Sequence, residues 1–209
     1  DFYWLTETDG LVMIAAVDFT GHGVPGAFMS IVGFNQLNNA VNVKQARKAS
    51  EILNELNKGV INTLNENTSD SSIKDGMDMT LCVFDFPNKK VEFAGANNPI
   101  ILIRDNNPVK YKGDRFPIGA FVENSEQLFT NNEIDIKQGD MIYLFSDGYA
   151  DQFGGPENKK FFTRRFEELL LEIHNKPLDE QKELLKTTLY DWMGSNGQVD
   201  DILVIGVKI

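Results

Sequence analysis

Isolated acidic residues stand at the ends of several apolar stretches of the chain, where buried strands are predicted to begin or end. They are Asp1, Asp18, Asp147 and Asp200, with Asp201 as the alternative to Asp200. Acidic side chains are rarely buried unless they are paired or bind a metal. Lys and Arg lie mostly in predicted helices and polar loops. A shared divalent cation is therefore the simplest way to hold these carboxylates together.

The chemistry of such a site follows from its oxygen ligands. Carboxylates favour Mg²⁺ or Mn²⁺ over Zn²⁺, and the chain has only His22, His174 and Cys82 to offer a softer ion. Two such ions would bind phosphate oxygens and lower the pKa of a bridging water. This predicts hydrolysis of a phosphate ester by a metal-activated water. The alternative for any single aspartate, Asp201 in particular, is an ordinary cap or turn residue.

A hairpin is predicted to place two of these carboxylates together. Asp9-Gly10 is a strong signal for a two-residue turn between β-prone segments. With these two residues in the turn, Asp1 falls directly opposite Asp18 on the same face of the sheet. Like charges in that position repel one another. A facing pair therefore indicates either a raised pKa or a bound cation.

Hydrophobic spacing predicts the elements that position these residues. Helices are expected from about residue 25 to 42 and 44 to 65, and over 159–173 and 178–193. Strands are expected over 2–5, 11–17, 79–86, 91–94, 100–103, 141–145 and 202–209. Strand groups separated by pairs of long helices predict an α+β fold, in which sheets stack with helices outside.

Composition limits the kinds of binding partner and the cellular compartment that are expected for the chain. The chain has 209 residues and a formal net charge of -11, which argues against nucleic acid and anionic membranes as main partners. The single Cys82 lies in an apolar run and is interpreted as a small buried hydrophobe. A chain without a disulfide framework, signal peptide or apolar membrane span is expected to be cytoplasmic. It begins at Asp1 without Met, so we expect it to be part of a longer protein.

The glycine-rich segment after Asp18 allows other interpretations. Residues 21–26 match the dinucleotide fingerprint G-x-G-x-x-G between a strand and a helix. A nucleotide-binding oxidoreductase is disfavoured because no acidic residue ends a second strand about twenty residues on. His22 is either a proton donor to the leaving group or a structural loop residue. His174, in a predicted helix, is expected to be a surface or core residue.

Several motifs, in order along nearly the whole chain, resemble one known family. They are Asp-Phe-Tyr-Trp (1–4), Asp-Phe-Thr-Gly-His-Gly-Val-Pro-Gly-Ala-Phe-Met (18–29), Gly-Ala-Asn-Asn-Pro (95–99), Asp-Arg-Phe-Pro-Ile-Gly (114–119), Leu-Phe-Ser-Asp-Gly-Tyr-Ala-Asp-Gln (144–152) and Gln-Val-Asp-Asp-Ile (198–202). Together they resemble the bacterial SpoIIE/RsbU-type serine phosphatases. These are a branch of the PP2C-like, metal-dependent (PPM) protein phosphatases.

The resemblance implies an α-β-β-α sandwich of two mainly antiparallel sheets and a centre with two Mn²⁺ or Mg²⁺ ions. It implies that Asp1 and Asp18 ligate both metals and that the backbone carbonyl of Phe19 joins one of them. Asp147 and Asp200 are implied to complete the other. The family has Gly-Gly and one or more strands before the first Asp, so an N-terminal edge strand is expected to be missing here.

The resemblance also implies a role in signalling. The substrate is expected to be a phosphoserine or phosphothreonine protein, often a small STAS-type anti-sigma-antagonist in this branch. Residues 1–209 are expected to form the C-terminal output domain below an upstream sensor domain, without inserting into a membrane. The alternative function is a catalytically weak PP2C-like interaction module. Arg115 is a candidate for contacting phosphate.

Overall fold

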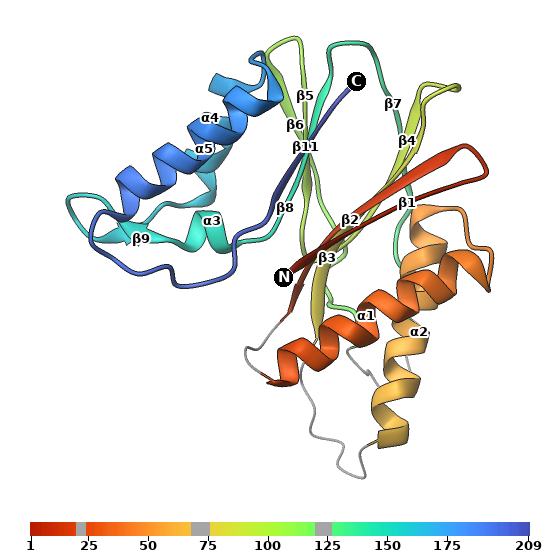
Figure 1. Cartoon of the computed structure of the whole chain (residues 1–209). Helices are drawn as coiled ribbons and strands as arrows, with labels where there is room; N and C mark the ends of the chain where they lie inside the picture. The colour runs from red at the N-terminus through yellow and green to blue at the C-terminus, as the bar shows by residue number, and fades with distance from the viewer. Residues whose placement is uncertain (20–23, 68–75, 120–126) are drawn as a thin grey trace. The chain divides into compact units, whose positions relative to one another are not determined.

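The computed structural model describes residues 1–19, 24–67, 76–119 and 127–209 (Figure 1). His22, for which two roles were predicted, and the glycines at 21 and 23 lie outside the described residues. The chain divides into two compact units. The first unit comprises Asp1–Pro99 and Lys112–Ile136, and the second comprises Ile100–Tyr111 and Lys137–Ile209.

The first unit contains, in its described part, a five-stranded antiparallel sheet in the order β1-β2-β3-β4-β7. The strands are β1 (Phe2–Thr8), β2 (Leu11–Phe19), β3 (Met77–Asp85), β4 (Lys90–Ala96) and β7 (Asn132–Asp135). The turn between β1 and β2 has positive φ at Asp9 (53°) and Gly10 (77°), as a type I′ hairpin turn requires. Phe2 pairs with Val17, so the predicted register is confirmed and Asp1 continues it opposite Asp18.

Two helices pack on one face of this sheet, α1 (Val24–Asn42) and α2 (Ala49–Asn67). Alternate strand residues such as Trp4 and Met13 are buried against helix residues such as Leu37 and Leu56. Burying a side chain of this size contributes roughly 1.5–3 kcal/mol. This core therefore anchors β1 and β2, the strands that end at the predicted ligands.

The prediction that the second helix begins near Lys44 is wrong, because α2 begins at Ala49. Gln45 has a positive φ of 56°, which a helix does not allow. The first amides of the helix are satisfied by side chains elsewhere in the unit. Ala49 N donates to Glu92 Oε2 at 3.2 Å, and Ser50 N donates to Asn131 Oδ1 at 3.1 Å. These bonds tie the start of α2 to β4 and to the residue before β7.

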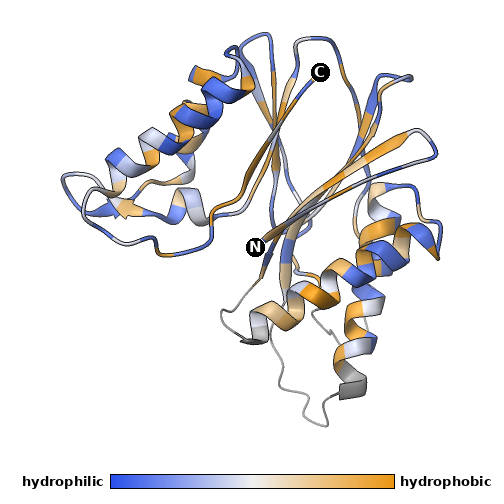
Figure 2. Cartoon of the chain, in the orientation of Figure 1, coloured by the Kyte–Doolittle hydropathy of each residue, from blue (hydrophilic) through white to orange (hydrophobic). Residues whose placement is uncertain are grey.

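The second unit has, among its described residues, a four-stranded antiparallel sheet in the order β11-β8-β5-β6 and a short ribbon β10-β9. The strands are β5 (Ile100–Arg104), β6 (Asn107–Tyr111), β8 (Met141–Phe145), β9 (Phe153–Gly154), β10 (Lys159–Lys160) and β11 (Val204–Lys208). The helices are α3 (Gly148–Asp151), α4 (Thr163–Ile173) and α5 (Leu178–Met193). Figure 2 shows hydrophobic and hydrophilic residues alternating along α4 and α5, as in helices with one buried face.

The core of the second unit is rich in aromatic residues. Phe145 at the end of β8 meets Phe166 of α4 edge to face, with ring centroids 5.1 Å apart. Tyr149 of α3 stacks at an angle on Phe166 at 4.7 Å and meets Phe161 at 5.2 Å. Such contacts fix ring geometry as well as burying area. They hold the segment around Asp147 between β8 and α4.

The sequence predicted β8 and α5 with their observed bounds, but it missed several short elements. Residues 159–162 were expected to start a helix, whereas Lys159–Lys160 form β10 and α4 begins at Thr163. The reason is Phe162, whose φ of 70° is incompatible with a helix. No described helix is long and apolar enough to cross a membrane.

An ion pair inside the second unit gives a stability prediction. Arg104 Nε donates to Asp140 Oδ1 at 2.8 Å and Nη2 donates to Oδ2 at 2.5 Å, while Asp140 is only 2% exposed. Burial raises the pKa of Asp140, but the bonds from Arg104 and from the Lys137 amide outweigh it, so the pKa lies below its ordinary value. We expect Asp140→Asn to lower the free energy of unfolding at pH 7 by about 3 kcal/mol.

Because the folded-state pKa is lowered, this contribution is present above the unfolded pKa of about 3.9 and is lost as pH falls through the folded value. Urea denaturation at pH 7 and pH 3 checks this. The gap between wild type and Asp140→Asn should narrow at pH 3. Asp105→Asn, an isosteric change in an exposed turn, is the matched control. A gap that is the same at both pH values would contradict the assignment.

Candidate metal centre

Asp18 lies between two other carboxylates at one end of the first unit's sheet. The hairpin register continues to Asp1 on one side, and Asp18 pairs directly with Asp78 of β3 on the other. Residues that face each other across antiparallel strands project from the same side of the sheet. Asp1, Asp18 and Asp78 therefore form a row of acidic residues on one face. Like charges that face each other across strands repel, and a bound cation would relieve that repulsion.

Asp78 is a residue that the sequence interpretation missed. The predicted strand began at Met79, and nothing local indicates that Asp78 faces Asp18 across two neighbouring strands. Its Oδ1 accepts a hydrogen bond from Asn97 Nδ2 at 2.7 Å. Burial raises the pKa of Asp78 above its ordinary value, while the bond from Asn97 works in the opposite direction. Asp78 is thus oriented by a neighbour while it adds charge beside Asp18.

The segment that carries Arg115 borders the same end of this sheet. Asn97 N donates to the carbonyl of Asp114 at 2.8 Å, and Met77 and Ile118 exchange backbone hydrogen bonds at 2.9 and 2.8 Å. Arg115 itself is exposed. The segment that carries Arg115 is therefore attached next to Asp78, and a phosphate contact by Arg115 stays a prediction.

Phe19, whose carbonyl is a predicted ligand, ends β2 and is held by aromatic packing. Its ring stacks on Phe2 with centroids 5.8 Å apart and an interplanar angle of 23°. On another side, a Cβ added at Gly33 of α1 would lie 3.3 Å from Phe19 Cζ. The side chain therefore fixes the backbone at the point where the sheet ends. Beside it, Oδ2 of Asp1 is shielded from solvent.

Asp147 and the Asp200–Asp201 pair come together along the backbone of the second unit. Asp147 follows β8 and Ser146, and its carbonyl accepts a hydrogen bond from Asp151 N in α3 at 3.0 Å. Ser146 N donates to the carbonyl of Leu203 at 3.0 Å, and Leu203 N donates to Ser146 Oγ at 3.1 Å. The segment that precedes β11 therefore runs beside the segment that follows β8.

Gly148 allows these two segments to approach closely. A Cβ added at Gly148 would lie 2.0 Å from the carbonyl oxygen of Asp201. Asp200 Oδ1 accepts the amide of Asp201 at 2.7 Å, and the Asp200 carbonyl accepts Gln198 Nε2 at 2.7 Å. Asp147, Asp200 and Asp201 are all exposed. The Asp200 carboxylate thus has the turn role foreseen as an alternative, and its role as a ligand stays a prediction.

The remaining candidates are accounted for by the core. His174 is 6% exposed, and its Nδ1 lies 2.6 Å from the carbonyl oxygen of Leu171. Cys82 is fully buried in β3, and burial raises the pKa of its thiol, so it is inert as a ligand or nucleophile. The interpretation of Cys82 as a buried hydrophobe is confirmed, and of the two alternatives for His174, surface or core, the structure shows the core.

The donor chemistry of the two groups fits a hard divalent cation. Each predicted ligand is a carboxylate or a backbone carbonyl, and these are the ligands that Mg²⁺ and Mn²⁺ prefer. Asp1, Asp18 and Phe19 belong to the first unit, and Asp147 and Asp200 to the second. Among the residues that the structure describes, no three acidic, His or Cys side chains converge into a complete metal-binding group.

Comparisons with known proteins give consistent results. The family described as Stage II sporulation protein E (SpoIIE) matches residues 8–209. The SiaA-PP2C domain of Pseudomonas aeruginosa is similar over 100% of this chain and 80% of its own, with 29% identity and a TM-score of 0.88. The α+β fold with two antiparallel sheets is thereby confirmed as PP2C-like. No curated protein matches the chain in sequence.

More distant structures share the fold. One contains the PP2C phosphatase domain and a fragment of the regulatory domain of SpoIIE from Bacillus subtilis (17% identity, 100% of this chain, 58% of that chain, TM-score 0.73). Another contains the RsbU and RsbW domains of a Mycobacterium tuberculosis protein (19% identity, 100% of this chain, 54% of that chain, TM-score 0.75). RsbX, solved in complex with magnesium, is also similar (14% identity, 98% of this chain, 84% of that chain, TM-score 0.60).

The close approach at Gly148 generates a prediction for this centre. In Gly148→Ala the new methyl group would overlap the Asp201 carbonyl, so the segment before β11 must move. We expect a loss of about 1–3 kcal/mol in the free energy of unfolding, as in other overpacked sites. Thermal and urea denaturation measure it. Gly197→Ala, where no atom lies within 4 Å of the added Cβ, is the control and should change stability little. Equal stability of the two variants would refute the packing of Asp201 on Gly148.

Proposed function

Because the chain belongs to the SpoIIE family of PP2C-like phosphatase domains, we propose that it is a metal-dependent protein serine/threonine phosphatase. It would hydrolyse phosphoserine or phosphothreonine on a partner protein. The observation that carries the proposal is the row of carboxylates formed by Asp1, Asp18 and Asp78 at the end of one sheet. Such a row supplies the oxygen ligands that a hard divalent cation prefers.

The proposed ligands of two Mn²⁺ or Mg²⁺ ions are those that the resemblance implies. In the first unit they are Asp1, Asp18 and the carbonyl of Phe19. In the second they are Asp147 and Asp200. The magnesium complex of RsbX supports the choice of metal within this fold. The oxygen-only donor set supports it independently.

The charge of the chain also requires a cation. A formal net charge of -11 disfavours the approach of a phosphate dianion, which is the group that a phosphatase must bind. When bound, the two ions would place positive charge beside the phosphate. They would also lower the pKa of a bound water, so that it can lose a proton and act as the nucleophile. The chain's own residues hold the geometry. The hairpin and the Phe2–Phe19 stack fix Asp18, and Gly148 and Ser146 fix the segment around Asp147.

The proposed setting is bacterial signalling in the cytoplasm. Residues 1–209 would be the output domain of a longer protein with an upstream sensor. The structure of SpoIIE, which includes a fragment of a regulatory domain, supports this arrangement. The substrate would be a phosphorylated protein, for which a STAS-type anti-sigma-antagonist is the leading class. The RsbU and RsbW domains found together in one mycobacterial protein support such a partner system.

The alternative function is a regulatory interaction module with the same fold and little catalysis. Asp78 is relevant to this choice, because a module that binds no cation gains nothing from a further carboxylate opposite Asp18. The phosphatase is therefore favoured. The two candidates differ in whether a divalent metal is needed for any activity of the domain.

Hydrolysis of p-nitrophenyl phosphate tests the proposal. We expect Mn²⁺-stimulated turnover that is abolished by chelation and restored by added metal. Asp18→Asn should reduce kcat/KM by at least about 100-fold, because it removes the central ligand while it keeps the size of the side chain. Circular dichroism should show an intact fold. Asp9→Asn, at the opposite end of the same hairpin, is the matched control and should retain activity.

Turnover that survives both chelation and Asp18→Asn would contradict the metal-dependent mechanism. Wild-type protein that is folded but inactive with Mn²⁺ and Mg²⁺, towards both p-nitrophenyl phosphate and phosphoprotein substrates, would favour the interaction module.

A further inference from the structure

A buried glutamine in the second unit joins the segment after Asp147 to the segment that carries Asp200. Gln152 follows α3 directly and is fully buried. Its Nε2 donates to the carbonyl of Gly197 at 3.0 Å and to that of Phe153 at 3.1 Å. Its Oε1 accepts the amide of Val199 at 3.3 Å. One side chain thus holds both ends of the short stretch that leads to Asp200.

We propose that Gln152 is a positioning residue that fixes segment 197–201 against α3, so that Asp200 and Asp201 keep a constant place relative to Asp147. The positioning itself is a property of the second unit. Its consequence for metal affinity rests on the proposed function. Groups that orient metal ligands commonly change metal affinity by about 10–100-fold when they are removed.

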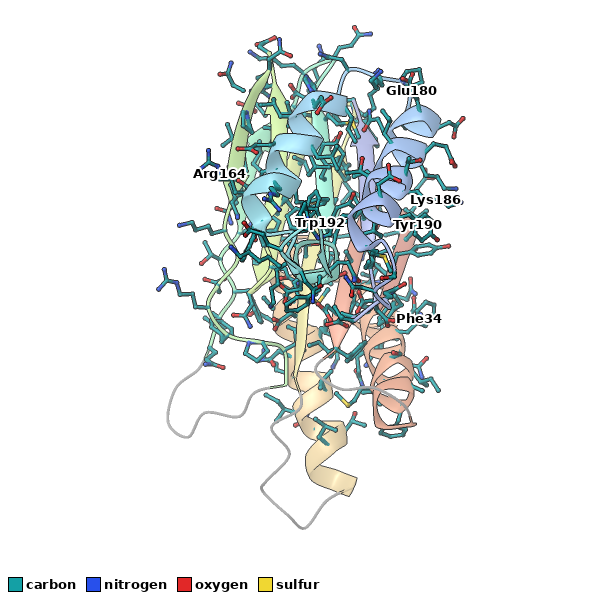
Figure 3. All side chains as sticks on the ribbon, turned by 90° about the vertical axis from the view of Figure 1, so that its left-hand side faces the viewer. Phe34, Arg164, Glu180, Lys186, Tyr190 and Trp192 are labelled. Atoms are coloured by element: carbon teal, nitrogen blue, oxygen red, sulfur yellow. The ribbon has the colours of Figure 1, made fainter. Side chains whose placement is uncertain are left out.

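The backbone of Gln152 is itself anchored, so its side chain extends from a fixed point. Its carbonyl accepts Trp192 Nε1 at 3.1 Å and Phe161 N at 2.9 Å. Trp192 belongs to α5 and its ring contacts α4 (Figure 3), with Arg165 of α4 stacked 4.5 Å from the ring centre. The Phe161 ring meets that of Trp192 edge to face at 5.3 Å. Gln152 is therefore held by α5 and by the segment that follows β10.

The turn that follows Gln152, at Gly154 and Gly155, packs against the end of α5. A Cβ added at Gly154 would lie 1.8 Å from the Trp192 carbonyl oxygen, and Gly155 N donates to that oxygen at 2.8 Å. Both glycines allow the ribbon to pack directly on the end of α5. The frame around Gln152 is thus formed by contacts with α5 and with the β9–β10 ribbon, and these contacts do not involve the Asp200 segment.

Only a carboxamide of this length satisfies both groups of the segment. Gly197 presents a carbonyl and Val199 an amide, so the buried side chain must donate and accept at once. Glutamate would keep an acceptor for Val199 but would place negative charge beside the Gly197 carbonyl. Methionine would fill the space and leave both backbone groups without this partner, which is costly in a buried site.

Two further contacts hold the rest of the segment, which makes the effect of Gln152 local. Asp201 packs on Gly148, and Leu203 is bonded to Ser146. Loss of the Gln152 contacts should therefore free residues 197–200 while β11 stays paired with β8. The expected result is a looser Asp200 in a folded domain.

The test compares Gln152→Met with Gln181→Met in the full chain. Gln181 is the matched control because it is also a buried glutamine, 3% exposed, with three hydrogen bonds. Its partners are Tyr143, His174 and Lys176, away from segment 197–201. Amide hydrogen exchange of residues 197–201 is measured without metal. We expect it to be at least about tenfold faster in Gln152→Met and unchanged in Gln181→Met.

Mn²⁺ titration of the same proteins supplies the second measurement. The dissociation constant should rise about tenfold or more in Gln152→Met and stay near wild type in Gln181→Met. Should Gln152→Met fail to fold, Gln152→Asn, which keeps the carboxamide but is one methylene too short to reach both groups, is compared in its place. Unchanged exchange at 197–201, or equal changes in the Gln152 and Gln181 variants, would overturn the proposal.

Failure of the proposed function would look different. Wild-type protein that binds no Mn²⁺ would contradict the metal centre, while the exchange measurement would still decide whether Gln152 positions the segment.

Discussion

Electrostatic repulsion at the end of one sheet is the constraint on which the first unit depends. Asp18 faces acidic residues on both neighbouring strands, Asp1 and Asp78. The repulsion must therefore be offset elsewhere in the unit, while pairing continues through this end, where Phe19 pairs with Met77. The tight turn at residues 9–10 and the core under α1 and α2 supply this stability. A fold that spends packing energy to keep like charges together is typical of a site that gains its stability from a bound ligand.

In the second unit, contacts between uncharged groups hold the predicted ligands in place. Its predicted ligands are exposed and lie on two neighbouring segments. Gly148 has no side chain, so the segments can approach closely, and hydrogen bonds from the Ser146 hydroxyl and the Gln152 carboxamide join them. The aromatic core beneath, around Tyr149, holds the first segment, and the second is fastened to it. The position of Asp200 therefore depends on residues that carry no charge.

Sequence reasoning succeeded where the structure is local. The Asp1–Asp18 pairing follows from one turn and two adjoining strands, so it was readable from Asp9-Gly10 alone. Asp78 was missed because the pairing of β2 with β3 is set by packing across two intervening helices. Gln152 gave no signal for a related reason, since its partners lie far along the chain at 197–199. Phe162 shows a further limit: its positive φ delays the start of a helix from the predicted Lys159 to Thr163, and no propensity of phenylalanine indicates this.

The central claim is that these carboxylates exist to hold divalent cations. Isothermal titration of Mn²⁺ into the metal-free protein, with Asp18→Asn in parallel, tests it most directly. If the carboxylates bind two ions, we expect saturable binding of two ions to the wild-type chain and a marked loss of affinity in Asp18→Asn, with both proteins equally folded. Absence of binding to the folded wild-type protein at millimolar Mn²⁺ and Mg²⁺ would contradict it.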